Sequence, residues 1–327
     1  MGEVQEMNNK FNIDFVGKKK VFFIISIAII AFSILSTFIF GANLDIQFKG
    51  GTILTYIYDG TIDQAQFERD ATEALGGIGV TSTVGEDFTT GRNNIQLSLI
   101  SNAGLTSDKQ FDLTNAITEK YSANSIELIE SSDVSPSSGK EFFLKCTVAV
   151  LLSFIVLIIY IAVRFKNIGG WLAGVCAIIA LLHDCIIVYG TFIVCGMSIN
   201  ANFMAVVLTI LGYSINNTIV IYDRIRENET LFRKTKTHAE IVNLSINQSL
   251  TRSINTSITT IAAMLAVTIV AAIYGVTSII SFSLPMMVGM IAGAYSSVCF
   301  TCPLWLTLEG KIGGNGSKSG AKKKANA

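Results

Sequence analysis

Six apolar stretches, interrupted by one polar insert, constrain this chain more than any other feature of its sequence. Each stretch reaches the roughly 20 residues that a helix needs to cross the apolar core of a bilayer. The insert lies between the first stretch and the second, so the predicted order is one membrane helix, one folded domain and five more helices. The stretches occupy residues 21–40, 142–163, 168–195, 203–222, 254–274 and 278–308.

The charged residues indicate how the helices are oriented. They make up 15% of the chain, whereas a typical soluble domain has about 25%. Residues 42–139 carry 14 acidic and 5 basic side chains, and 17 of the other 19 basic side chains gather in four places. Six crossings put those places on one side, so the positive-inside rule predicts cytoplasmic termini and an external insert. The four places are the N-terminus at 1–20, then 164–166, 224–252 and 311–324.

The expected fold class is therefore an α-helical integral membrane protein with six transmembrane helices and one extracytoplasmic domain. The first stretch is longer than the core of a usual signal peptide and lacks a clear small-residue cleavage site, so we expect a retained helix. The expected parts are a cytoplasmic N-terminus at 1–20, helix 1 at 21–41, the outer domain at 42–139, helices 2–6 within 140–308 and a cytoplasmic basic tail at 309–327.

The insert has the pattern of a small α/β domain. Its predicted strands are rich in Ile, Val, Thr and Tyr, and its two predicted helices each carry one apolar stripe. The order strand, helix, strand, strand, helix, strand is that of a ferredoxin-like fold. We expect strands at 52–58, 80–84, 94–100 and 125–129, and helices at 62–75 and 106–121 with Thr61 and Thr106 as caps.

Two segments are expected to join this domain to the membrane helices. Gly50 and Gly51 precede the first strand. Glycine tolerates backbone angles that other residues avoid, so a sharp turn or hinge is expected there. The Ser-rich segment 131–139 is expected to be the joint that leads back to the bundle.

Asp184 lies near the middle of the third stretch, where an aspartate costs about 2.5–3.5 kcal/mol on insertion scales. It must therefore face the interior of the bundle and find a partner. Two hypotheses remain open: a titrating carboxylate in a proton path, or one member of a structural polar pair. His183 points about 100° away around a helix, so we expect a lone buried histidine with satisfied hydrogen bonds.

The fourth stretch contains two adjacent amides. Asn216 and Asn217 lie just inside the boundary that Asp223 and Arg224 mark on the cytoplasmic side. Amides in an apolar helix need hydrogen-bond partners, and hydrogen bonds between helices are the simplest interpretation.

Arg252 opens the fifth stretch, with Asn255 three residues later on the same helix face. A long arginine side chain at a helix end can extend to the membrane interface. It can also pair with a polar group on the fourth helix, which is antiparallel to the fifth. The sequence leaves both possibilities open.

Motifs of soluble catalysis are missing from the sequence. We find no phosphate-binding loop, no dinucleotide-binding glycine pattern, no zinc-protease motif and no nucleophile motif. The six cysteines lie in or beside apolar stretches, without disulfide or metal-ligand spacing. We therefore expect no enzyme, no cofactor and no metal, and any work must draw on a partner or an ion gradient.

Five segments together closely resemble the SecD/SecF family of bacterial protein-export subunits, and within it the SecF members, which are related to the resistance-nodulation-division transporters. The segments follow the family's order and spacing from about residue 12 to residue 310, and the pair in the fourth helix is the most specific. They read FVGKKKVFF, LDIQFKGGT, ALLHDC, GYSINNT with YDRIREN, and SLTRSINTS.

The resemblance implies a role in protein export across the bacterial cytoplasmic membrane. Such a subunit pairs with SecD, joins the SecYEG channel and helps to pull unfolded polypeptides across, using a proton or sodium motive force. The resemblance also implies that the outer domain moves relative to the bundle. Contacts with membrane lipids are expected, and none with nucleic acid.

One departure from the family pattern matters. The family usually reads GYSIND, whose aspartate is regarded as a proton carrier, whereas this chain has Asn217, which cannot titrate. The family's arginine partner matches Arg252. Three hypotheses follow: SecD alone supplies the carboxylate, which we favour; Asp184 takes the role; or coupling is weakened, lost or altered towards another cation, with Asn217 as a neutral ligand.

Two other function classes compete with protein export. The first is an independent ion-coupled transporter, which needs a complete pathway in one chain, although only Asp184 is acidic in mid-membrane and no inverted repeat is visible. The second is a binding module on a passive anchor, which gives no reason for buried polar residues in the helices.

Overall fold

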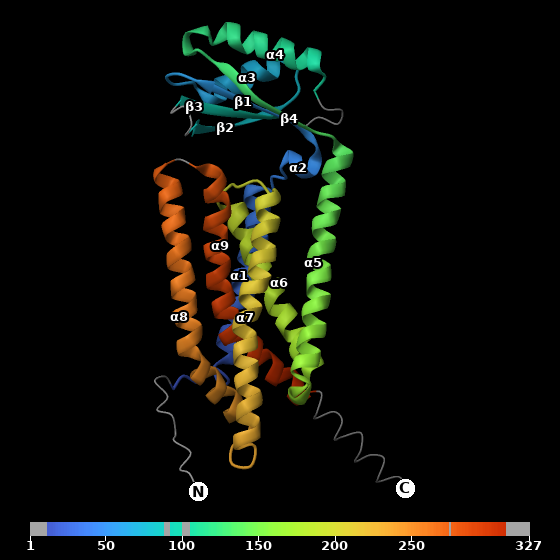
Figure 1. Cartoon of the computed structure of the whole chain (residues 1–327), viewed down its shortest axis with the longest axis vertical. Helices are drawn as coiled ribbons and strands as arrows, with labels where there is room; N and C mark the ends of the chain where they lie inside the picture. The colour runs from blue at the N-terminus through green and yellow to red at the C-terminus, as the bar shows by residue number, and fades with distance from the viewer. Residues whose placement is uncertain (1–11, 88–91, 100–104, 275, 312–327) are drawn as a thin grey trace.

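The computed structural model describes residues 12–87, 92–99, 105–274 and 276–311. It is a helical bundle with a small α/β domain at one end (Figure 1). Six helices of this described part are long and apolar enough to cross a membrane, which confirms the predicted multi-pass architecture. Their spans are Lys19–Phe40, Ser137–Arg164, Gly170–Val194, Ala201–Phe232, His238–Ile273 and Ser278–Lys311.

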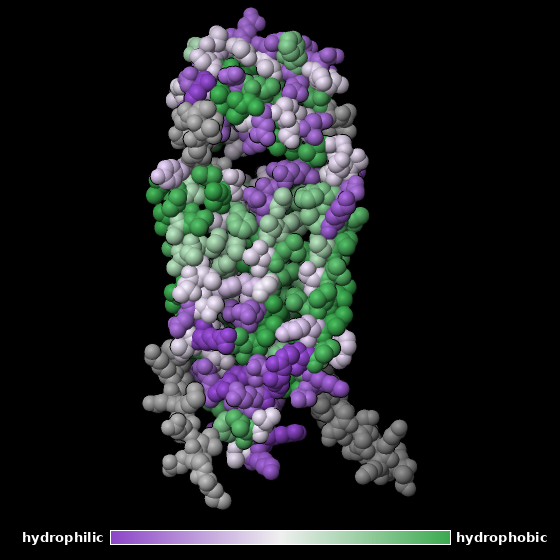
Figure 2. Space-filling view, in the orientation of Figure 1, coloured by the Kyte–Doolittle hydropathy of each residue, from purple (hydrophilic) through white to green (hydrophobic). Residues whose placement is uncertain are grey.

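The bundle is packed around two central helices. More than half of the membrane window of α6 (Gly170–Val194) and of α7 (Ala201–Phe232) is buried, but only 11% of that of α5 (Pro136–Arg164) and of α8 (His238–Ile273). An apolar band therefore covers the outside of the bundle between two polar ends (Figure 2). The bundle is completed by α1 (Lys19–Phe40), α9 (Thr277–Tyr295), the π-helical turn η3 (Ser296–Thr301) and a helical segment at 302–311.

Glycines let these helices approach one another closely. A Cβ atom on Gly170 would lie 2.4 Å from the carbonyl oxygen of Ala162 in α5. One on Gly190 would lie 2.4 Å from Ser33 Oγ in α1. One on Gly293 would lie 2.9 Å from Ser214 Cβ in α7. These distances are below normal carbon contacts, so a side chain at any of these positions requires the helices to separate.

The outer domain contains a four-stranded antiparallel sheet with the strand order β2-β3-β1-β4. Figure 1 shows α3 and α4 on the face of the sheet that points away from the bundle. A buried apolar cluster between these helices and the sheet includes Tyr56, Phe67 and Leu113. The elements are β1 (Gly51–Tyr58), α3 (Gln64–Ala74), β2 (Val80–Asp87), β3 (Arg92–Leu99), α4 (Ser107–Lys120), η1 (Ser122–Asn124) and β4 (Glu127–Val134).

The six predicted strands and helices of the insert all exist, but several ends differ. Thr61 is not a cap, because α3 is capped by the Asp63 carboxylate, which accepts from Ala65 N and Gln66 N. Thr106 occupies the N-cap position of α4 without a side-chain hydrogen bond to the helix. The residue predicted to end the third strand, Ile100, lies outside the described residues.

Both connections between domain and bundle are short. A four-residue helix, α2 (Ile46–Lys49), precedes Gly50 and Gly51, whose φ angles of 83° and 146° confirm the expected glycine turn. The junction between domain and bundle lies at Ser135, inside the predicted joint at 131–139, but the segment is not a loop, because β4 continues to Val134 and α5 begins at Pro136. Aspartate and glutamate are uncommon in strands, so the polar composition hid the second half of β4. Proline is tolerated in the first turn of a helix, so Pro136 did not exclude a helix start.

A second set of contacts fixes α2 to the bundle. The Phe48 ring stacks on Phe142 of α5 at a centroid distance of 5.6 Å. The Gln47 side chain accepts from Ala201 N at the start of α7, and Leu44 forms a β-bridge with Ile199 between α6 and α7. The entrance to β1 is therefore held against the α6–α7 connection.

Helices α7 and α8 extend beyond the predicted apolar stretches. Helix α7 continues past Asp223 and Arg224 to Phe232, and α8 begins at His238, well before residue 254. The Thr237 and Glu240 side chains form a capping box at the start of α8. The basic segment between the stretches is therefore a helical hairpin, since hydropathy reports only the part of a helix that lipid surrounds. The expected cytoplasmic tail beyond Lys311 and most of the N-terminal segment lie outside the described residues.

The contact of Gly190 with α1 gives a prediction. Gly190→Ala forces α1 away from α6 and lowers the melting temperature of the protein in detergent, by the equivalent of about 1–3 kcal/mol. Gly212→Ala is the matched control, because a Cβ on Gly212 meets no atom within 4 Å. Equal melting temperatures of the two variants would contradict the close packing.

Candidate functional site

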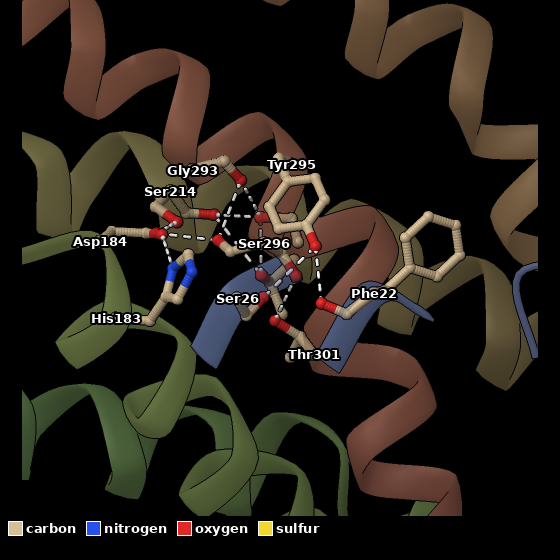
Figure 3. Close-up of polar contacts among 11 residues, drawn as sticks. Phe22, Ser26, His183, Asp184, Ser214, Gly293, Tyr295, Ser296 and Thr301 are labelled. Carbon is tan, nitrogen blue, oxygen red and sulfur yellow. Dashed lines mark hydrogen bonds and ion pairs between the residues drawn. The ribbon is translucent and has the colours of Figure 1, made fainter. Parts of the chain in front are cut away.

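The Asp184 carboxylate lies inside the bundle, with 0% of its side chain exposed. Its Oδ2 atom accepts hydrogen bonds from Ser214 Oγ of α7 at 2.6 Å and from Ser296 Oγ of η3 at 2.9 Å. Its Oδ1 atom lies 2.9 Å from His183 Nδ1. Figure 3 shows these four residues, the carboxylate cluster, converging from three helical elements.

The expectation for His183 is wrong. Its imidazole pairs with Asp184 instead of acting alone, and its Nε2 atom is buried with no hydrogen-bond partner among the described residues. The ring stacks on Phe300 at a centroid distance of 5.6 Å. The rotation of about 100° separates the two Cβ directions, but the near ring nitrogen of a histidine still reaches the carboxylate of the next residue.

The π-helical turn η3 places hydroxyl groups around this carboxylate. Ser296 Oγ reaches Asp184, while Ser297 Oγ donates to the carbonyl oxygens of Ser214 and Gly293. The Thr301 hydroxyl donates to the carbonyl oxygen of Ser296 at 3.0 Å. A π-helical turn redirects side chains within a helix and is often found at functional sites. Here it turns two consecutive serines towards α6 and α7.

A hydroxyl network continues from the cluster towards α1. Tyr295 OH donates to the carbonyl oxygen of Phe22 at 2.8 Å, and Ser26 Oγ lies 3.3 Å from Tyr295 OH (Figure 3). Ser26 is completely buried. These contacts join the end of α9 to α1 and form a second polar group beside the carboxylate cluster, since Tyr295 directly precedes Ser296.

Asn217 does not join the carboxylate cluster. It is 3% exposed, and its Nδ2 atom has no hydrogen-bond partner among the described residues. Ser253 of α8, which is also buried, likewise has no partner for its hydroxyl there. Hydrogen bonds from Asn228 to Ser245 and from Tyr213 to Ser257 set the register of α7 and α8, so Asn217 and Ser253 lie at one level of that interface. The interface between α7 and α8 therefore contains two buried polar groups without partners, Asn217 Nδ2 and Ser253 Oγ.

Arg252 and Asn255 lie on the exposed side of α8, and Asn216 is exposed on α7 at the same level. In the part of the chain that the structure describes, Arg252 forms no hydrogen bond or ion pair, so the possible pairing with α7 is not formed. An arginine and two amides thus face outward from apolar helices, where lipid is a poor environment for them.

Asp223 and Arg224 hold the end of the bundle that carries residues 12 and 311. Asp223 Oδ1 lies 3.1 Å from an Arg164 nitrogen of α5 and 2.7 Å from one of Arg226. Arg224 Nε donates to Gln248 Oε1 of α8 at 2.6 Å. These two residues tie α7 to its neighbours and do not contact Asp184 or Asn217.

The sequence interpretation missed the serines that complete the site. Ser214 belongs to the quoted GYSINNT segment, and Ser296 and Ser297 follow the small residue Gly293. Serine can bond to its own helix backbone, so it gives no hydropathy signal in an apolar stretch. Its position one turn from a close-packed glycine was the available clue.

The carboxylate cluster can hold one proton between two groups. In one arrangement a ring N–H of His183 donates to the Asp184 carboxylate. In the other, the protonated Asp184 donates its O–H to the same ring nitrogen, which then carries no proton. The two serine hydroxyls donate to Oδ2 and so stabilise the ionised acid. The chemistry that His183 and Asp184 can supply is proton exchange between an acid and a base.

Comparison with known proteins places this geometry in a family. A family model described as "Protein export membrane protein SecD/SecF, C-terminal" matches residues 114–311. A protein translocase subunit SecF from Rickettsia bellii is 35% identical over 297 residues, covering 90% of this chain and 93% of that protein. The chain belongs to the SecD/SecF family. A SecF from Petrotoga mobilis is also 35% identical, over 305 residues covering 90% of this chain and 95% of that protein.

Solved structures of SecDF have the same fold. The crystal structure of SecDF, a translocon-associated membrane protein from Thermus thermophilus, matches 92% of this chain with a TM-score of 0.76 and 29% identity. A SecDF structure in a super-membrane-facing form matches 97% with a TM-score of 0.64 and 28% identity. This chain spans 39% and 40% of those two longer chains. It thus corresponds to about two fifths of each SecDF chain.

The hydrogen bonds of Asp184 give a second prediction. Ser214→Ala removes a donor from a buried carboxylate and destabilises the protein by about 1–3 kcal/mol, measured as a lower melting temperature in detergent. Ser253→Ala is the matched control, since it deletes a buried hydroxyl without a partner in the described residues. If Ser253→Ala melts at as low a temperature as Ser214→Ala, the hydrogen bond from Ser214 to Asp184 contributes no particular stability.

Proposed function

We propose that this chain is a non-enzymatic accessory subunit of protein export that works with a SecD-type partner and draws on a proton or sodium motive force. The observation that carries the proposal is an incomplete site. Asp184 is enclosed within the bundle, whereas Arg252 and Asn255 face outward from α8 without partners in the described residues. A second membrane protein that covers this face would complete it.

The length of the related structures supports such a partner. SecDF chains are more than twice as long as this chain, and the part that matches is about two fifths of each. A bundle that exposes most of α5 and α8 has surface for additional helices. We therefore infer a heterodimer with SecD, associated with the SecYEG channel and with an unfolded polypeptide in transit.

The proposed location is the bacterial cytoplasmic membrane, with both termini in the cytoplasm and the sheet outside. The separation of acidic and basic residues along the sequence supports this topology. We further assign the outer domain to the ferredoxin-like class, which its βαββαβ element order and the strand order β2-β3-β1-β4 support. The exposed apolar surface of the helices is proposed to contact lipid where no partner covers it.

Because Asn217 stands where the family has an aspartate, we favour the hypothesis that SecD supplies the titrating carboxylate. Asn217 cannot carry a proton, and Asp184 is already bonded to His183, to Ser214 of α7 and to Ser296 of η3. An acid from a partner can reach Arg252, which is exposed on α8. The charge-carrying pair then forms only at the interface between subunits.

A third prediction separates the hypotheses about coupling. In membrane vesicles with SecD present, Arg252→Gln loses the stimulation of export by the ion gradient, because the partner's acid loses its counter-charge. Asp184→Asn keeps that stimulation, provided that the variant is folded. The measurement is export of a secreted protein with and without the gradient, at constant ATP and motor protein.

Opposite results would reassign the site. If Asp184→Asn loses gradient stimulation while Arg252→Gln keeps it, Asp184 is the carrier. Asn217→Asp tests the remaining hypothesis, with Asn216→Asp as its control at an exposed neighbour. Increased gradient stimulation only in Asn217→Asp indicates that coupling is weakened in the natural chain.

Purification gives a fourth prediction that distinguishes the function classes. The protein is expected to co-purify with SecD in a 1:1 ratio. A monomer that conducts ions after reconstitution would instead support an independent transporter. Stable capture of an unrelated ligand by the outer domain would support a scaffold.

A further inference from the structure

His238 bridges two carboxylates at the end of the bundle that carries residues 12 and 311. Its Nδ1 atom contacts the Glu229 carboxylate of α7, and its Nε2 atom lies 2.8 Å from Glu309 Oε2 of the last helical segment. His238 is the first residue of α8. One imidazole therefore connects three helices, and 38% of its side chain is exposed to solvent.

The number of donors limits the charge states in which both contacts are hydrogen bonds. An ionised carboxylate only accepts hydrogen bonds, and a neutral imidazole has a single N–H. Both contacts can be hydrogen bonds at once only if His238 carries two N–H groups or if one glutamate is protonated. Of these arrangements, an imidazolium between two carboxylates is the one that places opposite charges in contact at both ring nitrogens.

The imidazole also covers an aromatic column inside the bundle. Its ring lies edge-on to Trp305 at a centroid distance of 5.3 Å, Trp305 contacts Tyr222 at 6.0 Å, and Tyr222 contacts Phe165 of α5 at 5.7 Å. Trp305 and Tyr222 are completely buried. The bridge thus closes the end of the column formed by α5, α7 and the last helical segment.

The surroundings of His238 are strongly charged. It lies at the wall of an open cavity of about 980 Å³, which Asn167 and Ile168 line from the α5–α6 connection and Ile241 from α8. The charged groups that face the cavity, besides Glu229 and Glu309, are all basic and come from α7 and the α7–α8 turn. They are Arg226, Arg233, Lys234 and Lys236. These cations oppose the charge on the imidazole, and the two carboxylates favour it.

We propose that Glu229, His238 and Glu309 form a pH-sensitive clamp that locks the α7–α8 hairpin to the last helical segment. The clamp is closed when His238 is charged. As the pH rises and the imidazole loses a proton, one of the two carboxylates faces a ring nitrogen that can no longer donate. The stabilisation is therefore present while the ring is charged, and it is lost as the pH rises and the ring loses its proton.

With the topology proposed above, this end faces the cytoplasm, and the clamp responds to cytoplasmic pH. An export subunit that consumes a proton gradient would thereby also sense the pH on the side where protons arrive. The clamp itself follows from contacts within one chain, so a test in detergent is independent of the proposed function.

Tryptophan fluorescence gives a direct test. The chain has two tryptophans, and Trp171→Phe removes the exposed one, so that Trp305 alone reports. An imidazolium quenches indole emission more than a neutral imidazole. We expect the emission of Trp171→Phe to rise from pH 5.5 to pH 8.5 in one transition, and Trp171→Phe with His238→Gln to show none.

Changing a partner carboxylate tests the bridge itself. Glu309→Gln, in the Trp171→Phe background, lowers the midpoint of the transition by about one pH unit, because a neutral amide favours the charged ring less than a carboxylate does. Lys234→Gln, which removes a cation from the same cavity, does not lower it. A transition that persists in His238→Gln, or a midpoint that Glu309→Gln leaves unchanged, overturns the proposal.

Melting temperatures test whether ionisation changes the clamp. His238→Arg keeps a charged donor at every pH. We therefore expect the melting temperature of His238→Arg, minus that of the unsubstituted protein, to be larger at pH 8 than at pH 6. Comparing the two proteins at each pH removes general effects of pH on the fold. A difference that does not change with pH means that the bridge is not a switch, even if the fluorescence titrates.

Discussion

A carboxylate without exposed surface sets the geometry of the central helices. Asp184 must receive hydrogen bonds from the protein, because neither lipid nor water reaches it. Its donors come from three helical elements that have to approach within the reach of a serine side chain. Gly293 makes that approach possible beside Ser214, and η3 turns Ser296 towards the acid. The close approach at Gly293, the irregular turn and the serines beside it all serve one buried acid.

The second polar region of the bundle has the opposite character. Around Arg252 and Asn217, polar groups are exposed or buried without partners in the described part of the chain. Unpaired polar groups are costly in an apolar environment. A self-sufficient protein would satisfy them internally, as it does at Asp184. The second subunit proposed above would explain their state, and this chain covers about two fifths of each SecDF chain.

Periodicity and hydropathy were sufficient to predict the six membrane helices and the order of the outer-domain elements. They failed where polar residues continue a helix or strand beyond lipid, as in α8 before Arg252 and in β4 after Ile129. They also failed where a contact depends on side-chain reach, as between His183 and Asp184. Serine donors remained hidden because serine is compatible with both lipid-facing and buried helix positions.

The two connections to the outer domain enter its sheet through neighbouring strands. Helix α1 leads through α2 into β1, and α5 receives the chain directly from β4 through Ser135 alone. Since β1 and β4 are paired antiparallel, any change in the relative height of α1 and α5 acts on this one pair as shear. Few loop residues could absorb that shear. They are 41–45 between α1 and α2, Gly50 before β1 and Ser135 after β4. Movement of either helix is therefore transmitted to the domain through the paired strands β1 and β4, and the domain cannot move freely on a flexible linker.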